Sequence, residues 1–339
     1  MGLISFAYER LLRASTRARG RWGSAFRAGL GLAVSAASAI RDIPIVAEVR
    51  GHKLRMPLSH KLPWYVAVNP FYDELMTRLS RYLRDRDGRV TLIDVGANIG
   101  DTITACAEHP ADRFLAIEPN PHFGSYLRQN CGHLPNFRAL DVCCSSADGE
   151  SEFEIDEQDG TAKIRERPGG RPMVRKTLDS ILELDRDYAD FNFLKVDTDG
   201  HDFDVLRGAS HSIARNHAAA VLFECDSFGS VTYVDDLLAA VTIFLSAGYK
   251  RAIFYDNFGY LFAAVSLDDL DALKHMLLYQ LTSRFYYFDV LVIPENDFDA
   301  FLEQEERYFA ESATTEAARQ AARVALAMGP NGGDVSKGR

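Results

Sequence analysis

The sequence has few cysteines, and their spacing argues against several classes of protein. None of the five forms a CxxC pair or a zinc-type spacing. Small secreted scaffolds are dense in disulfides, and structural zinc sites need clustered Cys and His ligands. The five residues, most of them in apolar or helical stretches, are Cys106, Cys131, Cys143, Cys144 and Cys225. We therefore expect buried thiols in a reducing compartment, the cytoplasm, and no structural metal.

The chain also lacks an excess of basic residues. Lys and Arg number 38 against 48 Asp and Glu, so the formal net charge is -10. A general nucleic-acid binder needs positive charge to neutralise phosphates, and we expect no nucleic-acid partner here. An apolar content of 47% across 339 residues is enough for one large α/β core with appendages.

A long hydrophobic run is missing as well. The apolar run AGLGLAVSAASAI (28–40) is too short to span a bilayer, which needs about 20 apolar residues. Residues 1–41 carry seven arginines against one acid, Glu9. Two interpretations stay open: a helix packed on the main domain, or a basic amphipathic patch that makes weak contact with an anionic membrane surface.

The remaining pattern divides the chain into three parts. Residues 1–70 form a basic segment followed by a hairpin at 45–58, residues 71–300 form the main domain, and residues 301–339 form a helix with a disordered tail. The main domain opens with a helix over 70–85. Apolar strands then alternate with helices. The strands are predicted at 88–96, 113–120, 136–144, 191–200 and 218–226, and the helices at 101–109, 121–130 and 201–216. This alternation predicts a mostly parallel sheet with helices on both faces.

Two stretches interrupt the alternation. Residues 148–177 begin as an extra strand and continue as a glycine- and arginine-rich loop over 158–175. That loop is either a lid whose arginines suit an anionic acceptor or a mobile solvated segment. The aromatic-rich strands in 248–265 and 284–294 predict an antiparallel edge, and the stretch FYYFDVLVI (285–293) would allow an edge-to-edge homodimer.

Five apolar runs end in an acid. They finish with Asp94, Glu118, Asp141, Asp197 and Glu224. The carboxyl ends of parallel strands lie on one edge of a sheet, where ligands bind. Carboxylates buried close together cost free energy unless a cation or hydroxyl groups bind to them. The pattern therefore predicts a ligand that carries a positive charge or hydroxyl groups.

The turn after the first of these acids distinguishes between cofactors. Its sequence, Gly96 to Gly100, lacks the GxGxxG spacing of a dinucleotide site, and Asp94 directly before it would repel a pyrophosphate. The same carboxylate would attract the ammonium group of S-adenosylmethionine, while Glu118 could accept both ribose hydroxyls. A nicotinamide-dependent oxidoreductase and a catalytically silent binding protein with this fold remain the alternatives.

Several motifs follow one another in a recognisable order. They are DVGANIGD, AIEPNP, TLDSILEL, FLKVDTDGHDFDVLRGA and VLFECD. Over about residues 50–295 the chain resembles FkbM-type methyltransferases. The resemblance implies a Rossmann-like class I methyltransferase fold, with a seven-stranded sheet whose last strand is antiparallel. It also implies methyl transfer from S-adenosylmethionine to a hydroxyl of a sugar, glycan or secondary metabolite. The family usually has glutamate where this chain has Asp199 and Asp202.

Cofactor contacts are assigned around the glycine turn. Gly96 and Gly100 would let the cofactor approach the backbone, Asp94 would hold its ammonium group, and Asn98 would contact its carboxylate. The remaining assigned contacts are Glu118 at the ribose, its neighbour Pro119, and Asp141 near the adenine amine. For the glycines the alternative is a tight turn, and for Asp141 it is a solvent-facing strand end.

Catalysis needs alignment and a base for the acceptor proton. His201 is the first candidate because its pKa suits proton acceptance near neutrality, and Asp197 and Asp199 are the others. His201 could instead cap the helix that begins at Asp202. Together these four residues could also bind a divalent cation, although the favoured expectation is that no metal is bound.

Overall fold

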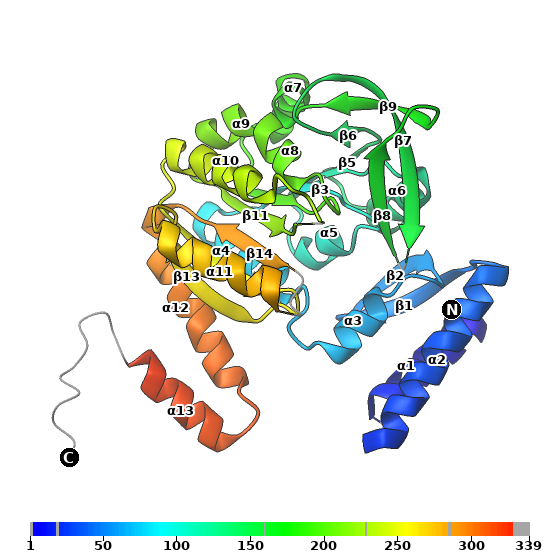
Figure 1. Ribbon diagram of the computed structural model, residues 1–339. Coiled ribbons are helices and arrows are strands. Elements are labelled where there is room, and N and C mark those ends of the chain that lie inside the picture. The colour runs from blue at the N-terminus through cyan, green and yellow to red at the C-terminus, as the bar shows by residue number, and fades with distance from the viewer. Residues whose placement is uncertain (1–2, 18–19, 159, 228, 284–286, 328–339) are drawn as a thin grey trace, which may run out of the picture.

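A large mixed sheet between two layers of helices forms the centre of the protein (Figure 1). The computed structural model describes residues 3–17, 20–158, 160–227, 229–283 and 287–327. The strands of the central sheet, in spatial order, are β13 (Leu261–Ser266), β12 (Arg251–Asp256), β14 (Phe288–Val292), β11 (Ala220–Cys225), β10 (Phe193–Val196), β3 (Thr91–Val95), β4 (Arg113–Ile117) and β5 (Phe137–Leu140).

The directions of these strands confirm the predicted class. Strands β5, β4, β3, β10 and β11 are parallel, and β14 runs antiparallel between β11 and β12. Chain order reverses between β3 and β10, which places a ligand crevice at their carboxyl ends. The predicted count of seven strands was wrong, since β13 adds an eighth strand, antiparallel to β12, at the edge.

Position within the sheet also corrects a second expectation. Strand β14 has hydrogen-bonded neighbours on both sides, so the aromatic stretch that contains it is not a free edge. An edge-to-edge dimer through residues 285–293 therefore has no basis in the described part of that stretch, residues 287–293. The edges of the sheet are β13 and β5.

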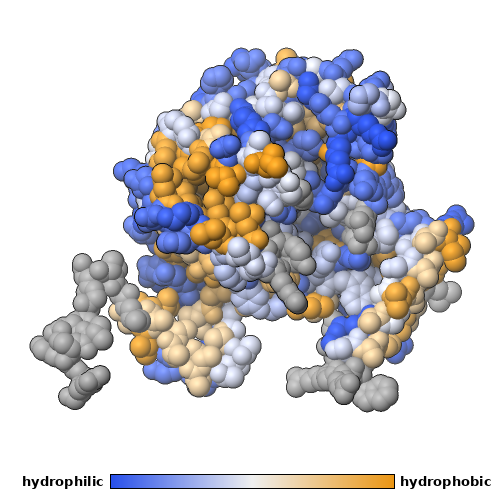
Figure 2. All heavy atoms as spheres, viewed as in Figure 1, coloured by the Kyte–Doolittle hydropathy of each residue, from blue (hydrophilic) through white to orange (hydrophobic). Residues whose placement is uncertain are grey.

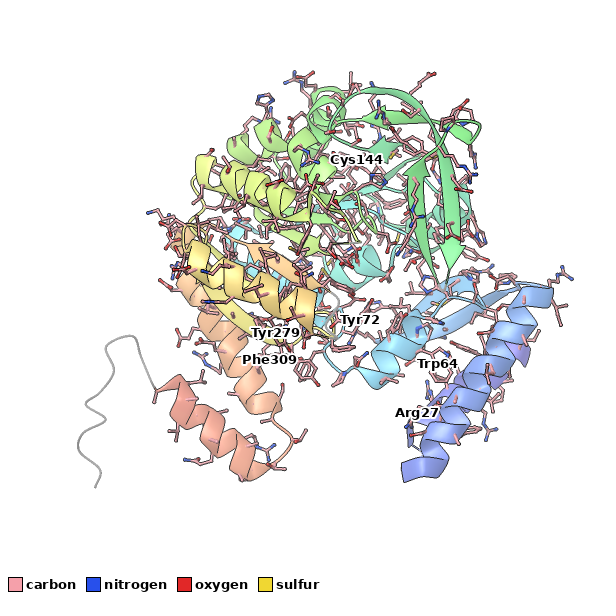
Figure 3. The ribbon with its side chains drawn as sticks, in the orientation of Figure 1. Arg27, Trp64, Tyr72, Cys144, Tyr279 and Phe309 are labelled. Carbon is pink, nitrogen blue, oxygen red and sulfur yellow. The ribbon has the colours of Figure 1, made fainter. Side chains whose placement is uncertain are left out.

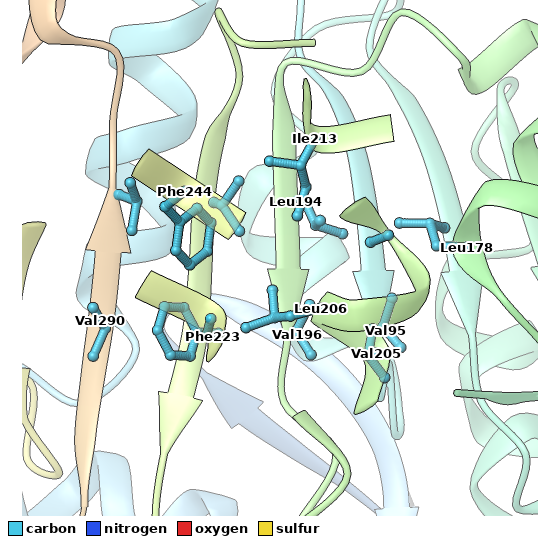
Figure 4. Close-up of a cluster of buried hydrophobic side chains, with 14 of the residues drawn as sticks. Val95, Leu178, Leu194, Val196, Val205, Leu206, Ile213, Phe223, Phe244 and Val290 are labelled. Atoms are coloured by element: carbon cyan, nitrogen blue, oxygen red, sulfur yellow. The ribbon is translucent and has the colours of Figure 1, made fainter. Parts of the chain in front are cut away.

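Helices cover both faces because the strands are apolar on both sides. The helices of one layer are α7 (Leu178–Leu184), α8 (Asp202–Gly208), α9 (Ser210–Arg215), α10 (Tyr233–Ser246) and α11 (Leu270–Thr282), with a short 3-10 helix at Arg186–Tyr188. The helices of the other layer are α4 (Glu74–Asp87), α5 (Asp101–Cys106), α6 (Pro121–Cys131) and α12 (Glu295–Ser312). Figure 4 shows Val196 and Phe223 of the sheet packed against Leu206 and Phe244. Each such side chain, fully buried, contributes about 1.5–3 kcal/mol.

Residues 143–176 form a second sheet, which corrects the predicted loop at 158–175. Its strands are β6 (Cys143–Cys144), β9 (Arg171–Lys176), β7 (Gly149–Gln158) and β8 (Thr161–Glu166), in that spatial order. Phe153 and Ile164 form its small core with Cys143. The strand predicted at 136–144 is also divided, because β5 belongs to the central sheet and β6 to this one.

The amino-terminal part stands apart from the central sheet. It comprises α1 (Leu3–Arg17), α2 (Gly20–Ile40), the predicted hairpin β1 (Pro44–Val49) and β2 (His52–Pro57), and α3 (Leu62–Val68). In Figure 1, α1 and α2 lie at the lower right, outside the layers. By length and composition alone, Gly23–Ile40 could cross a membrane, a test that signal sequences and core helices also pass. This window is longer than the apolar run 28–40 on which the sequence-based expectation rests, because it adds residues 23–27.

Two boundaries differ from the sequence-based expectation. Helix α4 begins at Glu74 rather than at 70, because Asp73 adopts a left-handed conformation with φ 58°. The predicted domain boundary at 300 falls inside α12, whose Phe298 and Phe301 are buried in the core. A further helix, α13 (Glu316–Leu326), follows, and the predicted disordered tail at 329–339 lies outside the described residues.

Candidate functional site

A cavity of about 410 Å³ opens at the carboxyl ends of β3, β4, β10 and β11, where the strand order predicted it. Such a volume suits a small-molecule ligand. Figure 3 labels two of its lining residues, Tyr72 and Cys144. Of the residues predicted from the sequence, the cavity is lined by Gly96, Asn98, Glu118, Pro119, Asp197, Asp199 and His201. The structure thus brings most of the predicted site residues together, and their roles stay predictions.

Three predicted residues lie away from the cavity lining. Asp94 is fully buried beneath it, and Gly100 lies at the start of α5. Asp141 lies outside the cavity and forms an ion pair of 2.7 Å with Arg128 on the surface. Its surroundings fit the alternative of a solvent-facing strand end, and the adenine contact stays a prediction.

The glycine turn is packed against protein backbone. Gly96 has φ 84°, and a Cβ there would lie 1.7 Å from the carbonyl oxygen of Asp197. A Cβ on Gly100, also at φ 84°, would lie 2.5 Å from the Sγ of Cys131. Both positions therefore require glycine for a tight turn, whatever the cofactor does. This packing holds the turn against the end of β10.

Backbone amides hold Glu118 in a fixed orientation. One carboxylate oxygen accepts a hydrogen bond from the Asn98 N–H and the other from the Asn120 N–H, each at 2.8 Å. The residue is 5% exposed, and burial raises the pKa of its carboxyl to about 7. The Asn98 side-chain amide is engaged with the protein, since it donates to the Gly160 carbonyl at 2.7 Å. Glu118 can still accept bonds through its remaining lone pairs.

A single lysine lies among the acids below the turn. Lys195 Nζ lies 2.9 Å from Asp197 and 3.5 Å from Asp94. Burial acts to lower the pKa of Lys195, but the charges of Asp197 and Asp94 outweigh burial and raise it well above its ordinary value. Neither carboxylate oxygen of Asp94 accepts a hydrogen bond from any described residue. Asp94 therefore relies on its ion pair with Lys195 and has oxygens left to accept a further donor.

The cavity as a whole is negative. Its lining includes one lysine and six carboxyl groups, namely those of Asp73, Asp101, Glu118, Asp197, Asp199 and Glu224. Burial raises the pKa of the Asp199 carboxyl to about 6 and that of Asp101 to about 6. This arrangement suits a cationic ligand and disfavours the pyrophosphate of a nicotinamide cofactor.

The ring of His201 is engaged with protein groups. Its Nε2 lies 2.6 Å from the Ile164 carbonyl oxygen, and its Nδ1 lies 3.9 Å from the Asp204 carboxylate. Asp204 raises the pKa of His201 by favouring the protonated ring. The side chain makes no capping bond to α8; instead Asp202 accepts from the N–H groups of Thr198 and Gly200. In this conformation Nε2 is engaged by the Ile164 carbonyl, and the catalytic role of His201 stays a prediction.

Several cavity residues had escaped sequence reasoning. Asp101 directly follows the glycine turn, so its position was a usable signal. Others come from α3, from the loop before α4, from the turn between β12 and β13 and from the residue before β14, where no motif marked them: Tyr65, Tyr72, Asp73, Asn257, Phe258 and Tyr287. Among the described residues, no group of three or more His, Cys, Asp or Glu side chains is arranged to hold a metal ion.

The parallel sheet with its reversed strand order, the antiparallel β14 and the cavity at the glycine turn define a Rossmann-like class I methyltransferase fold. Residues 94–251 match the model of the methyltransferase FkbM domain. This match and the methyltransferase relative described next support methyltransferase activity for this chain.

Comparison with individual proteins gives more distant similarities. The chain is 29% identical over 181 residues to the hexuronic acid methyltransferase AglP of Haloferax volcanii, covering 52% of this chain and 72% of that protein. The methyltransferase FkbM structure from Methylobacillus flagellatus is 16% identical with a TM-score of 0.32, covering 47% of this chain and 38% of that one. The structure of a TehB-like SAM-dependent methyltransferase from Corynebacterium glutamicum is 12% identical with a TM-score of 0.33. The match covers 66% of this chain and 88% of that one.

Proposed function

We propose that the protein is an S-adenosylmethionine-dependent O-methyltransferase that acts on a hydroxyl group of a sugar, a glycan or a secondary metabolite. The observation that carries this proposal is the negative cavity beside the glycine turn of the FkbM domain. A methyl donor with a sulfonium and an ammonium group is complementary to that charge, whereas a phosphate-bearing cofactor is not.

The residues present fit S-adenosylmethionine. Glu118, held by two backbone amides, would accept the ribose hydroxyls. Asp94, with two unsatisfied oxygens, and Asp101 would attract the ammonium group. When bound, S-adenosylmethionine supplies an electrophilic methyl group, and the chain itself has to orient the acceptor and remove its proton.

An aromatic wall supports a sugar-like acceptor. Tyr65 and Tyr72 line the cavity with ring centroids 5.5 Å apart, and Phe258 and Tyr287 line it as well. Flat apolar rings beside polar groups are suited to a sugar, which has an apolar face and a polar rim. The methyltransferase AglP, the relative described above, acts on a hexuronic acid, so we place a uronic acid first among the acceptors.

A second cavity could receive the anionic part of such an acceptor. Its volume is about 450 Å³, and Ile164, Asp199 and His201 line both cavities. Lys163, Arg165 and Arg175 of the second sheet line it. The lining also includes the carboxylate of Glu166, which forms an ion pair of 2.6 Å with Arg175. The arginines of the predicted lid thus belong to strands beside the site, where they could attract a carboxylate.

Calorimetric titration with S-adenosylhomocysteine tests the cofactor assignment. We expect the wild-type protein to bind it in the micromolar range or tighter, and Glu118→Ala and Asp94→Ala to lose most of that affinity. Transfer of a labelled methyl group to methyl α-D-glucuronide, methyl α-D-galacturonide and methyl α-D-glucoside tests the acceptor. A folded wild-type protein that binds no S-adenosylhomocysteine would refute the proposed cofactor. Binding without transfer would favour a silent binding protein.

We further propose a cytoplasmic enzyme that touches an anionic membrane surface through residues 1–41. All five cysteines are free and buried, as a reducing compartment allows. Only 11% of the apolar window of α2 is buried. Figure 2 shows apolar residues along this helix pair, where the exposed side chains include Ile4, Phe6, Leu11, Phe26, Leu32 and Ile40. Flotation with anionic liposomes should depend on residues 1–41; equal flotation after their deletion would refute the contact.

Self-association is the remaining proposal about partners. An exposed apolar surface on α11 carries Leu278, Tyr279 and Leu281, and Tyr279 stacks on Phe262 of the edge strand β13. A homodimer through this surface would cover these side chains without using β14. Sedimentation of the purified protein distinguishes a dimer from a monomer.

A further inference from the structure

Asp73 lies at a position where an aspartate usually caps a helix, yet it does not do so. It precedes α4 and has φ 58°, a conformation uncommon for residues other than glycine. An N-cap aspartate normally accepts a hydrogen bond from the first turn of its helix, and Asp73 makes no such bond. Its side chain instead lines the main cavity, with Asp101 and Asp197.

Arg50 holds the loop that carries Asp73. Its guanidinium forms an ion pair with Glu74 and donates to the carbonyl oxygens of Pro70, at 3.1 Å, and Tyr72. Arg50 thus contacts residues on both sides of Asp73. A conformation that costs free energy persists only where its surroundings determine it, and such residues cluster at functional sites. The loop is fixed so that the carboxyl group faces the cavity rather than the helix.

A second loop across the cavity wall is packed onto the first. A Cβ on Gly259, which has φ 82°, would lie 2.2 Å from the Phe71 carbonyl oxygen. The rings of Phe71 and Tyr260 also meet edge to face, with centroids 4.6 Å apart. The turn between β12 and β13 is therefore packed directly on the loop that carries Asp73.

Asn257 on that turn is an unsatisfied group. It is 9% exposed and lines the cavity, and its side-chain oxygen has no hydrogen-bond partner among the described residues. Buried amide oxygens are normally paired, so this one marks a place for a ligand donor such as a hydroxyl group. Asp73 and Asn257 thus lie on two joined loops at the wall of one cavity, with Tyr72 beside them.

We infer that Asp73 is the catalytic base that takes the proton of the acceptor hydroxyl, and that Asn257 positions this hydroxyl. The inference rests on the proposed methyltransferase function. The acceptor oxygen forms a bond to the methyl carbon, the bond between that carbon and sulfur breaks with its electron pair left on sulfur, and the hydroxyl proton passes to the Asp73 carboxylate. The products are the methyl ether and S-adenosylhomocysteine.

The electrostatics of the cavity suit this step. Burial, with help from the charge of Asp101, raises the pKa of the Asp73 carboxyl to about 7. A base with a pKa near the working pH gives the best balance of ionisation and proton affinity. The other charged or titratable groups around it are Arg50, Tyr72, Lys195, Asp197 and Asp289. Asp197 pairs with Lys195, which lowers its pKa despite burial and makes it the weaker base.

Asp73→Asn tests the inference, with Asp85→Asn as its matched control. Asp85 lies on the exposed side of α4, so its substitution is the same exchange of aspartate for asparagine on the helix that follows Asp73 but outside the cavity. With the three methyl glycosides named above as acceptors, Asp73→Asn should lower kcat by about 100-fold or more. Its affinity for S-adenosylhomocysteine should stay within about threefold of wild type, since that ligand has no sulfonium charge for Asp73 to contact.

Stability against pH provides a readout that needs no turnover. An aspartate with a raised folded pKa binds a proton in the folded state that the unfolded state has released, so stability falls as pH rises from about 4 to 7. Urea midpoints of Asp73→Asn should therefore fall less than those of wild type between pH 5 and pH 8. Asp85→Asn should follow wild type.

The outcomes separate the two levels of the proposal. Asp73→Asn with wild-type kcat, or with a pH dependence of stability parallel to wild type, would overturn the role of Asp73 and leave the methyltransferase function intact. A wild-type protein that methylates none of the sugars would overturn the sugar acceptor, and with it this inference. Loss of kcat in Asp73→Asn alone, with cofactor binding kept, is the result expected.

Discussion

At the scale of single residues, the glycine turn shows which parts of the site a sequence can specify. The motif from Asp94 to Gly100 correctly located the turn at the end of β3, because glycine and aspartate patterns are local. It did not show that Gly96 packs against the Asp197 carbonyl, since that contact joins residues a hundred positions apart. Asp73 was not predicted as a site residue for the same reason. Its conformation depends on the ion pair between Arg50 and Glu74, and no local sequence pattern connects these two residues.

Gly96→Ala should unfold or loosen the site. The new methyl group would lie 1.7 Å from the Asp197 carbonyl oxygen at φ 84°, so both overpacking and backbone strain contribute. Together they should cost about 3 kcal/mol or more in the free energy of unfolding and abolish binding of S-adenosylhomocysteine. Gly88→Ala is the control, because Gly88 has φ 79° with no atom within 4 Å of the added carbon, and should cost only about 1 kcal/mol. Urea unfolding compares the two; equal losses would contradict the packing argument.

At the scale of elements, the sequence predicted the parts whose pattern is strong and missed those that depend on pairing. The buried strands and the hairpin at 45–58 were predictable because their apolar runs leave few alternatives. The strands β8 and β9 were not, since Arg165, Glu166 and Arg175 resemble a solvated loop until they pair with β7. Phe153 and Ile155 alternate within β7, and this was the one local signal of the second sheet.

Helix α12 shows how an element assigned to the tail belongs to the core. The guanidinium of Arg78 on α4 donates two hydrogen bonds to the Glu305 carboxylate, at 2.6 and 2.7 Å. The Tyr255 hydroxyl donates to the same carboxylate at 2.9 Å. The Glu305 side chain is 0% exposed. Because removing one partner leaves a buried charge unpaired, Glu305→Ala should cost about 3–5 kcal/mol.

The matched control for that change is Glu303→Ala on the same helix. Glu303 pairs with Arg307 at 2.7 Å on the surface, where such pairs contribute about 0–1 kcal/mol. Urea unfolding of both variants should show a clear loss for Glu305→Ala and almost none for Glu303→Ala. A small effect at both positions would mean that α12 does not depend on Arg78 for its place on the sheet.

At the scale of the whole molecule, charge is distributed unevenly. The net charge is -10, the described part of the arginine-rich stretch 1–41 lies at one end, and the carboxyl groups of the cavity lie beside the central sheet. The composition indicated an acidic protein, but only the fold shows that several acids share one cavity with a single lysine. Under the proposed function, this separation would let one end of the chain meet an anionic surface while the cavity binds a cationic cofactor.

The negative cavity should make the preference for S-adenosylmethionine over S-adenosylhomocysteine depend on pH. The two ligands differ by one methyl group and the positive charge on sulfur, so the ratio of their affinities isolates that charge. Burial raises the carboxyl pKa to about 7 for Asp73 and Glu118 and to about 6 for Asp101 and Asp199, so these groups lose protons between pH 6 and 8. Each new negative charge favours the sulfonium.

We therefore expect the affinity for S-adenosylmethionine relative to S-adenosylhomocysteine to rise by about tenfold from pH 6 to pH 8, equivalent to about 1.4 kcal/mol. The amino and carboxyl groups shared by the two ligands cancel in the ratio. Titration calorimetry of both ligands at each pH measures it, and Asp101→Asn should flatten the rise because one of the titrating carboxyl groups is removed. A ratio that stays constant with pH would show that these carboxyl groups do not face the sulfur, and the cofactor would then have to bind with its charge elsewhere.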